Sequence, residues 1–200
     1  MIEVVDVCKS FKDVDVLENA NGIFEQGIIY CLTGRNGTGK SVLLKLICEL
    51  IAPDQGFIRL PEKHRFGVMI DNPRFWRDMT GLETLRYLAS IRKEIDDDVI
   101  KRYMKEFGLW TYRNKPVGSY SLGMKQKLSI IQAFMEDPDI LLLDEPTNAL
   151  DDNSVEVFRS LLKQERDMGK YIIVTTHNIA DMEMITDQFI RLENRRLTFE

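Results

Sequence analysis

The sequence has few cysteines, no long apolar run and no excess of basic charge. Only 3 of its 200 residues are cysteine. Cys8, Cys31 and Cys48 lie far apart beside apolar runs and form no C-x-x-C pair, which indicates buried thiols rather than a zinc site or a disulfide framework. No apolar run approaches the roughly 20 residues that a membrane-spanning helix needs, and the N-terminus lacks the regions of a signal peptide. We therefore expect a soluble chain that works at a membrane only through another polypeptide.

The charge pattern argues against nucleic-acid binding. The formal net charge is −5, the isoelectric point is about 5.2, and acidic and basic residues are interspersed. A protein that binds a polyanion usually carries a basic patch instead. A length of 200 residues suits one domain with one sizeable core, so we expect a single domain over 1–200.

A glycine-rich stretch after an apolar run matches the phosphate-binding pattern G-x-x-x-x-G-K-S. An apolar stretch of strand type, 28–32, precedes it and a helical pattern, 42–47, follows it, in the order that a phosphate loop requires. Its backbone N–H groups and the helix N-terminus favour anions. Lys40 is expected to reach the β- and γ-phosphates and Ser41 to bind Mg²⁺, whereas Val42 has no assigned contact. The predicted phosphate loop is Gly34, Arg35, Asn36, Gly37, Thr38, Gly39, Lys40 and Ser41.

The flanking segments predict an α/β fold. Short strands are expected over 2–7 and 14–24, with a hairpin turn at Asn21-Gly22, and these form an antiparallel layer. Further strands are expected over 57–60, 66–70, 140–144 and 171–175. Four helices are expected between these strands. A capping box at Thr80 and Glu83 opens the first, and an acidic cap at Asp96 opens the second. Ser121 opens a third, which runs to about 136, and a fourth covers about 151–168. Asn72 and Pro73 are expected to lead the chain out of the sheet. The predicted division is a core of 1–70 and 138–200 with a helical subdomain of about 71–137.

Two carboxylates, Asp144 and Glu145, end the apolar strand that begins at Ile140. Asp144 is expected to hold Mg²⁺ directly or through water, and Glu145 to activate a water against the γ-phosphate. His177 follows the next strand, at the same edge of the sheet, where ligands of open α/β sheets bind. It can bond the γ-phosphate or orient Glu145, although a single histidine is also compatible with a purely structural role.

Phe11 is expected in the loop between the first two strands. There it can stack on adenine, or it can close the edge of the core, and its spacing does not separate the two roles.

Taken together, these residues resemble the ATP-binding subunit of an ABC transporter over essentially the whole chain. Beyond the phosphate loop and Asp144-Glu145, the segment 120–124 resembles the signature motif of that family, 148–151 its D-loop and 175–177 its switch histidine. The resemblance implies a P-loop NTPase of ABC type, with a mostly parallel core sheet, an antiparallel β layer and an inserted helical subdomain. It also implies a head-to-tail dimer in which Ser121 and Gly123 of one chain, together with Asp151, complete the ATP site of the other. Ser121 can serve as an ordinary helix N-cap at the same time.

The chain departs from the family pattern at several positions. Asp71 stands where the family usually has glutamine; its carboxylate can bind Mg²⁺ or its water, but it cannot donate as an amide does. Leu122 and Met124 replace the usual glycine and glutamine of the signature motif. The segments 70–76, 80–85 and 120–126 are similar to bacterial exporters of antibiotic, bacteriocin and multidrug type, which often have an acid at the position of Asp71.

The resemblance implies an MgATP-hydrolysing subunit of an exporter that drives a separate membrane-spanning subunit from the inner face of the cell membrane. Phe75 and Trp76 are candidates for docking that partner, or they pack within the helical subdomain. Two alternatives stay open: a soluble ABC-type ATPase without a transport partner, and a slowly hydrolysing regulatory module that ATP switches. A homodimer and a heterodimer of ATPase subunits are equally compatible with the sequence.

Overall fold

The computed structural model describes residues 1–12, 14–71, 74–92 and 95–199. Asn72 and Pro73, predicted to leave the sheet, lie outside the described residues. The strands are β1 (Ile2–Phe11), β2 (Val14–Phe24), β3 (Ile28–Thr33), β4 (Gln55–Arg59), β5 (Phe66–Met69), β6 (Ile140–Asp144), β7 (Tyr171–Thr175), β8 (Gln188–Glu193) and β9 (Arg196–Phe199). The α-helices are α1 (Lys40–Ile47), α2 (Gly81–Arg92), α3 (Asp97–Glu106), α4 (Leu122–Phe134) and α5 (Asp152–Asp167), and short 3₁₀ turns lie at Trp110–Tyr112, Val117–Ser119 and Ile179–Asp181.

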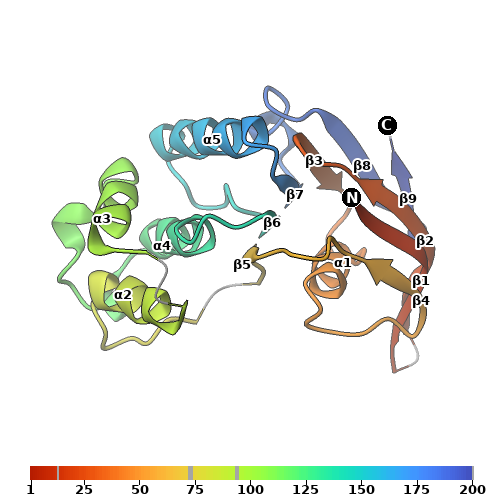
Figure 1. Ribbon diagram of the computed structural model, residues 1–200, viewed down its shortest axis with the longest axis horizontal. Coiled ribbons are helices and arrows are strands. Elements are labelled where there is room, and N and C mark those ends of the chain that lie inside the picture. Colours follow the sequence, from red (N-terminus) through yellow and green to blue (C-terminus); the bar gives the residue numbers. More distant parts are fainter. Residues whose placement is uncertain (13, 72–73, 93–94, 200) are drawn as a thin grey trace.

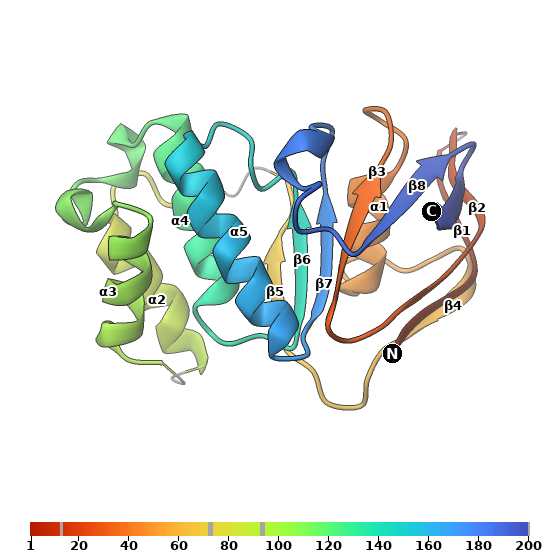
Figure 2. The ribbon, with the colours of Figure 1, turned by 90° about the horizontal axis from the view of Figure 1, so that it is seen from above.

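The strands form two sheets. The larger has the order β5-β6-β7-β3-β8-β9 and is parallel except for the β8–β9 pair; the smaller is antiparallel, with the order β2-β1-β4. Helices α4 and α5 cover one face of the large sheet and α1 the other, whereas α2 and α3 lie at the end of the molecule farthest from the small sheet (Figures 1 and 2). This is the predicted fold class, with β8 and β9 added after the last predicted strand.

Alternating side chains of the central strands fill two cores, because successive residues of a strand point to opposite faces. On β6, Leu141 and Leu143 pack with α4 and α5, while Ile140 and Leu142 pack toward α1 and the small sheet. All four are fully buried. Since both faces are covered, the strand reads as one continuous apolar run rather than as an alternating pattern.

The predicted helix starts are confirmed. Thr80 and Glu83 form a reciprocal capping box, with the Thr80 N–H 2.8 Å from the Glu83 carboxylate. Asp96 caps α3 by accepting from two backbone N–H groups, and Ser121 caps α4 by accepting from Met124 N–H at 3.2 Å.

Two predictions in the small sheet are wrong. Asn21-Gly22 is not a turn: Gly22 pairs with Val4 inside β2, and a Cβ there would come 2.8 Å from the ring of Phe199. The glycine therefore allows close packing of β9 rather than reversal of the chain. Phe11 ends β1 instead of lying in the loop.

The three cysteines were predicted to be buried thiols. Cys31 is fully buried, whereas Cys8 and Cys48 are partly exposed, and all three are free.

Candidate functional site

The phosphate loop joins the C-terminal end of β3 to the first residue of α1. Lys40 opens α1, and its side chain is only 7% exposed. Its ammonium lies 2.8 Å from the carbonyl oxygen of Gly34 and 3.4 Å from that of Arg35. The loop thus curls around the cation, which places a positive charge beside the N-terminus of α1, where an anion is favoured.

The acidic strand ends beside this loop. Asp144 is the last residue of β6, and its Oδ2 accepts a hydrogen bond from the Ser41 hydroxyl at 2.5 Å. Its Oδ1 accepts a hydrogen bond from the hydroxyl of Thr175 at the end of β7. The structure therefore brings together Ser41 and Asp144, two of the three predicted metal ligands, which are far apart in the sequence.

Glu145 and His177 form a close pair at the same edge. His177 Nδ1 lies 2.5 Å from Glu145 Oε2, and the His177 N–H donates to that oxygen at 3.2 Å. Lys40 Nζ lies 4.0 Å from the other carboxylate oxygen, Oε1. The three residues predicted to be catalytic, Lys40, Glu145 and His177, consequently meet in one place.

The donor set suits Mg²⁺ better than a softer metal. The Ser41 hydroxyl and the Asp144 carboxylate supply hard oxygen ligands, and the described residues contain no group of three or more His, Cys, Asp or Glu that could hold a metal by themselves. Mg²⁺ typically binds through one or two carboxylates together with substrate phosphates and water. The residues present thus fit a metal that arrives with a nucleotide.

Asp71 makes a different contact from the one predicted. Its carboxylate forms an ion pair with Lys45 on α1, at 2.7 Å, and its side chain is 62% exposed. Its role as a metal ligand stays a prediction.

A cavity of about 330 Å³ adjoins the phosphate loop. It is lined by Asn36, Gly37, Gly39, Lys40, Ser41, Val42, Asp144, Glu145 and Val16. A neighbouring cavity of about 570 Å³ is lined in part by Arg35, Thr38 and His177. Val16 of β2 was missed in the sequence because nothing in a strand residue shows that the small sheet folds back over the loop.

Ser121, Gly123 and Asp151 lie in a separate cavity of about 350 Å³, between the N-terminal ends of α4 and α5. The Asp151 carboxylate caps α5 and pairs with Lys127 at 2.6 Å. Chiefly because of the Lys127 bond, and also because of the bonds from Ser154, the pKa of Asp151 lies well below its usual range. These predicted site residues therefore do not join the phosphate-loop site of their own chain.

Two side chains that the sequence analysis missed hold the acidic loop. Thr175 contacts both Asp144 and Glu145. Gln126 of α4 is buried, and its amide donates to the carbonyl oxygens of Glu145 and Pro146, each at 3.0 Å. Their signal in the sequence is weak, since a threonine in a strand and a glutamine in a helix are ordinary.

Phe11 is 45% exposed. The Lys9 ammonium lies 5.4 Å from the ring centroid. Closing of the core edge and stacking on adenine both stay predictions.

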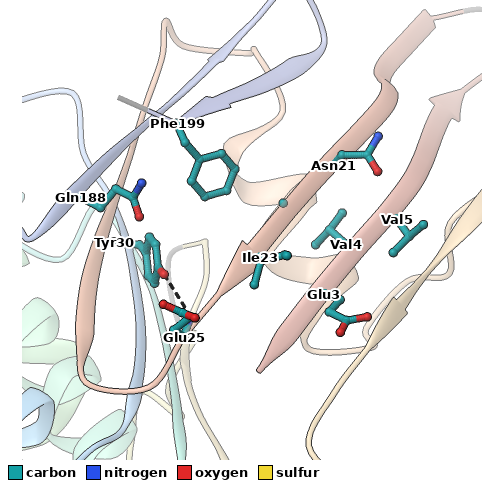
Figure 3. Close-up of a pocket in the computed structure, with 10 residues that line it drawn as sticks. Glu3, Val4, Val5, Asn21, Ile23, Glu25, Tyr30, Gln188 and Phe199 are labelled. Carbon is teal, nitrogen blue, oxygen red and sulfur yellow. Dashed lines mark hydrogen bonds between the residues drawn. The ribbon is translucent and has the colours of Figure 1, made fainter.

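A further cavity, of about 620 Å³, lies away from this site. It lies between β1–β2 and the C-terminal strands, where Tyr30, Phe199 and Ile23 face it together with Glu25 (Figure 3). None of the predicted site residues lines it. Size alone therefore does not mark the functional site, whereas the converging charged groups at the phosphate loop do.

Among the described residues, no helix has both the length and the apolar character needed to cross a membrane.

Comparison with known proteins gives one consistent family. The family model described as ABC transporter matches residues 17–148. The Bacillus subtilis (strain 168) protein named "Uncharacterized ABC transporter ATP-binding protein YybJ" is 37% identical over 98% of this chain and 94% of its own length. The bacitracin transport ATP-binding protein BcrA of Enterococcus faecalis is 33% identical over 94% of this chain and 64% of its own length. Among solved structures, the dimeric bacterial ABC transporter cassette MJ0796 is 25% identical with a TM-score of 0.89, over 100% of this chain and 98% of that one.

Proposed function

Because the chain belongs to the ABC transporter family as an ATP-binding, ATP-hydrolysing subunit, we propose that it drives export through a separate membrane-spanning subunit. A role in transport is supported by the similarity to BcrA, whose name records bacitracin transport, and export is the direction that we propose for it. The chain is proposed to act as one ATPase domain, 1–200, with a helical subdomain of about 71–137, held at the inner face of the cell membrane by its partner.

The phosphate loop is proposed to hold the triphosphate. Lys40 is bonded to two loop carbonyl oxygens, and phosphate oxygens are stronger acceptors because they are charged. Loop N–H groups from Gly34 to Ser41 and the N-terminus of α1 add donors. Ser41 and Asp144 would hold Mg²⁺, which neutralises charge on the phosphates when it is bound.

The observation that carries the proposal is the contact of 2.5 Å between Glu145 and His177 beside Lys40. Glu145 is placed to take a proton from a water that attacks the γ-phosphate. His177 holds the carboxylate in position through its ring nitrogen and its backbone N–H. A positioned base of this kind contributes about 10²–10⁴-fold to a rate.

A second chain is needed to use Ser121 and Gly123. They lie in another cavity, at the N-terminal end of α4, where helix N–H groups and the helix dipole favour a phosphate. We propose that two chains meet head to tail, so that the α4 N-terminus of each closes over the nucleotide in the other. ATP then favours the closed dimer, and hydrolysis releases it.

Substitution of Glu145 tests the mechanism. Glu145→Gln should bind ATP normally, lose steady-state phosphate release by about 10²-fold or more, and accumulate as an ATP-bound dimer in size-exclusion chromatography. Lys40→Ala should instead lose tight nucleotide binding. Wild-type turnover in Glu145→Gln would show that Glu145 is not the base.

The membrane partner is proposed to dock beside Trp76. Phe75 packs against the core, whereas Trp76 is 54% exposed and stacks edge-on against the exposed Tyr87, at a centroid distance of 5.0 Å. Next to them is a cavity of about 430 Å³ lined by Arg74, Phe75, Arg77, Val117 and Lys125. Its charged lining residues are all cationic, which favours an acidic cytoplasmic segment of the partner.

Alanine substitution tests this docking surface. Trp76→Ala should leave the ATPase activity of the isolated subunit intact but reduce co-purification with the membrane subunit and lower transport. Met168→Ala, which removes an equally exposed apolar side chain at the end of α5, is the control. Unchanged transport and co-purification in Trp76→Ala would remove the docking proposal.

A further inference from the structure

Thr175 links the two acidic residues of the site through one hydroxyl group. It is the last residue of β7 and is fully buried. Strands β6 and β7 run parallel, with Asp144 opposite Thr175. The Thr175 side chain therefore reaches the end of β6, where the two acidic residues lie. The hydroxyl donates to Asp144 Oδ1 and accepts from the Glu145 N–H at 3.0 Å.

We propose that Thr175 is a positioning residue for ATP hydrolysis, which orients the Asp144 carboxylate for Mg²⁺ and holds the Glu145 backbone so that its carboxylate faces His177. The proposal rests on the roles proposed above for Asp144 and Glu145.

The contacts of Asp144 show why one hydroxyl matters. Its two carboxylate oxygens each accept from a different hydroxyl, Ser41 on Oδ2 at 2.5 Å and Thr175 on Oδ1. Ser41 is itself a proposed metal ligand, so its oxygen is needed for the metal. Thr175 is fully buried and is not a proposed metal ligand, so its hydroxyl can hold the carboxylate while the metal is bound. Such outer partners fix the orientation of a metal ligand.

The contacts of Glu145 point the same way. Its φ of +51° lies in the left-handed region, which residues other than glycine rarely adopt. Its N–H is held by the Thr175 hydroxyl and, at 3.2 Å, by the Thr175 carbonyl oxygen. Its carbonyl oxygen accepts from Gln126. The peptide that carries the proposed base is thus fixed on both sides by Thr175 and Gln126, which line neither cavity beside the phosphate loop.

The test compares Thr175→Val, which keeps the shape but removes the hydroxyl, with Thr175→Ser, which keeps the hydroxyl. Thr84→Val is the matched control, because Thr84 is also fully buried and its hydroxyl donates to the backbone carbonyl oxygen of Thr80, just before α2, at 2.9 Å. Steady-state ATPase gives kcat and KM, and calorimetry compares ADP binding with and without Mg²⁺.

Thr175→Val should lower kcat about 10- to 100-fold and weaken the gain in ADP affinity that Mg²⁺ provides by a similar factor, while metal-free ADP binds as in the wild type. Thr175→Ser should recover most of both quantities, and Thr84→Val should change neither. Wild-type kcat and Mg²⁺ dependence in Thr175→Val would overturn the proposal, as would equal losses in Thr175→Ser. Glu145→Gln run alongside separates the two ideas: if it loses turnover while Thr175→Val does not, only the positioning role fails.

Discussion

At the scale of single residues, Glu165 is a buried carboxylate without full hydrogen bonding. It lies on α5, is 4% exposed, and its Oε2 has no hydrogen-bond partner among the described residues. Burial raises the pKa of Glu165 to about 7, and nearby Asp137 adds to the rise, while Lys170 and Arg102 oppose it. Tyr103 of α3 is also close enough to feel its charge. The folded protein therefore prefers Glu165 protonated.

This preference predicts a pH dependence of stability. In the unfolded chain a glutamate titrates near pH 4.3. Below that pH, the contribution of Glu165 to the unfolding free energy is therefore fully present. This contribution falls as the pH rises, because the folded state keeps the Glu165 proton while the unfolded state releases it. It is lost once the pH passes about 7. The total loss is about 4 kcal/mol of unfolding free energy.

Glu165→Gln should remove most of this decline. Urea unfolding at pH 5 and pH 8 should show a smaller loss of unfolding free energy between the two conditions in the variant than in the wild type. Glu62→Gln, at an exposed carboxylate, is the control and should keep the wild-type decline. Equal pH dependence in Glu165→Gln and the wild type would contradict the prediction.

At the scale of elements, the start of α4 is fitted against the loop before α5. A Cβ on Gly123 would lie 2.5 Å from the carbonyl oxygen of Ala149, closer than such atoms can approach. The two segments are also joined by the Lys127–Asp151 ion pair. The predicted signature segment and the predicted D-loop thus form one packed unit within the chain.

Gly123→Ala should therefore destabilise the protein although alanine is the better helix former. The gain in helix propensity is about 1 kcal/mol, whereas overpacking against an inflexible backbone atom costs about 1–3 kcal/mol. The urea midpoint should fall, and ATPase activity should fall with it because the α4 N-terminus is displaced. Leu122→Ala, which truncates an exposed neighbour, should change the midpoint little. A higher midpoint in Gly123→Ala would show that the loop yields freely.

The elements that the sequence predicted best are those whose signals are local. The strand-loop-helix order around the glycine-rich stretch, the capping box at Thr80 and Glu83 and the apolar strand before Asp144 each depend on a few consecutive residues. The structure confirms all three. Contacts between distant segments were not predictable: Thr175 meets Asp144 only because β6 and β7 pair in a particular register. The need for a glycine at position 22 was not predictable either, because the ring that packs closely against it belongs to Phe199, near the other end of the chain.

At the scale of the whole molecule, the predicted nucleotide contacts are divided between two places. Lys40, Asp144, Glu145 and His177 meet at the ends of the core strands, whereas Ser121 lines a separate cavity at the start of α4. In the head-to-tail dimer proposed above, both halves of each site would come together across the interface. The head-to-tail arrangement proposed above then makes each ATP site a product of two chains.

A mixture of two inactive variants tests this division. Lys40→Ala disables the phosphate loop, and Ser121→Asp keeps a good N-cap but sets a carboxylate against the γ-phosphate of the other chain. Alone, each dimer has no intact site. Mixed in equal amounts, about half of the dimers pair one of each and have one intact site, so about a quarter of wild-type ATPase activity should return. Ser121→Asn, which caps the helix without adding charge, should remain active by itself. Ser121 does not act across the interface if the mixture has no more ATPase activity than the two variants alone while Ser121→Asn stays active.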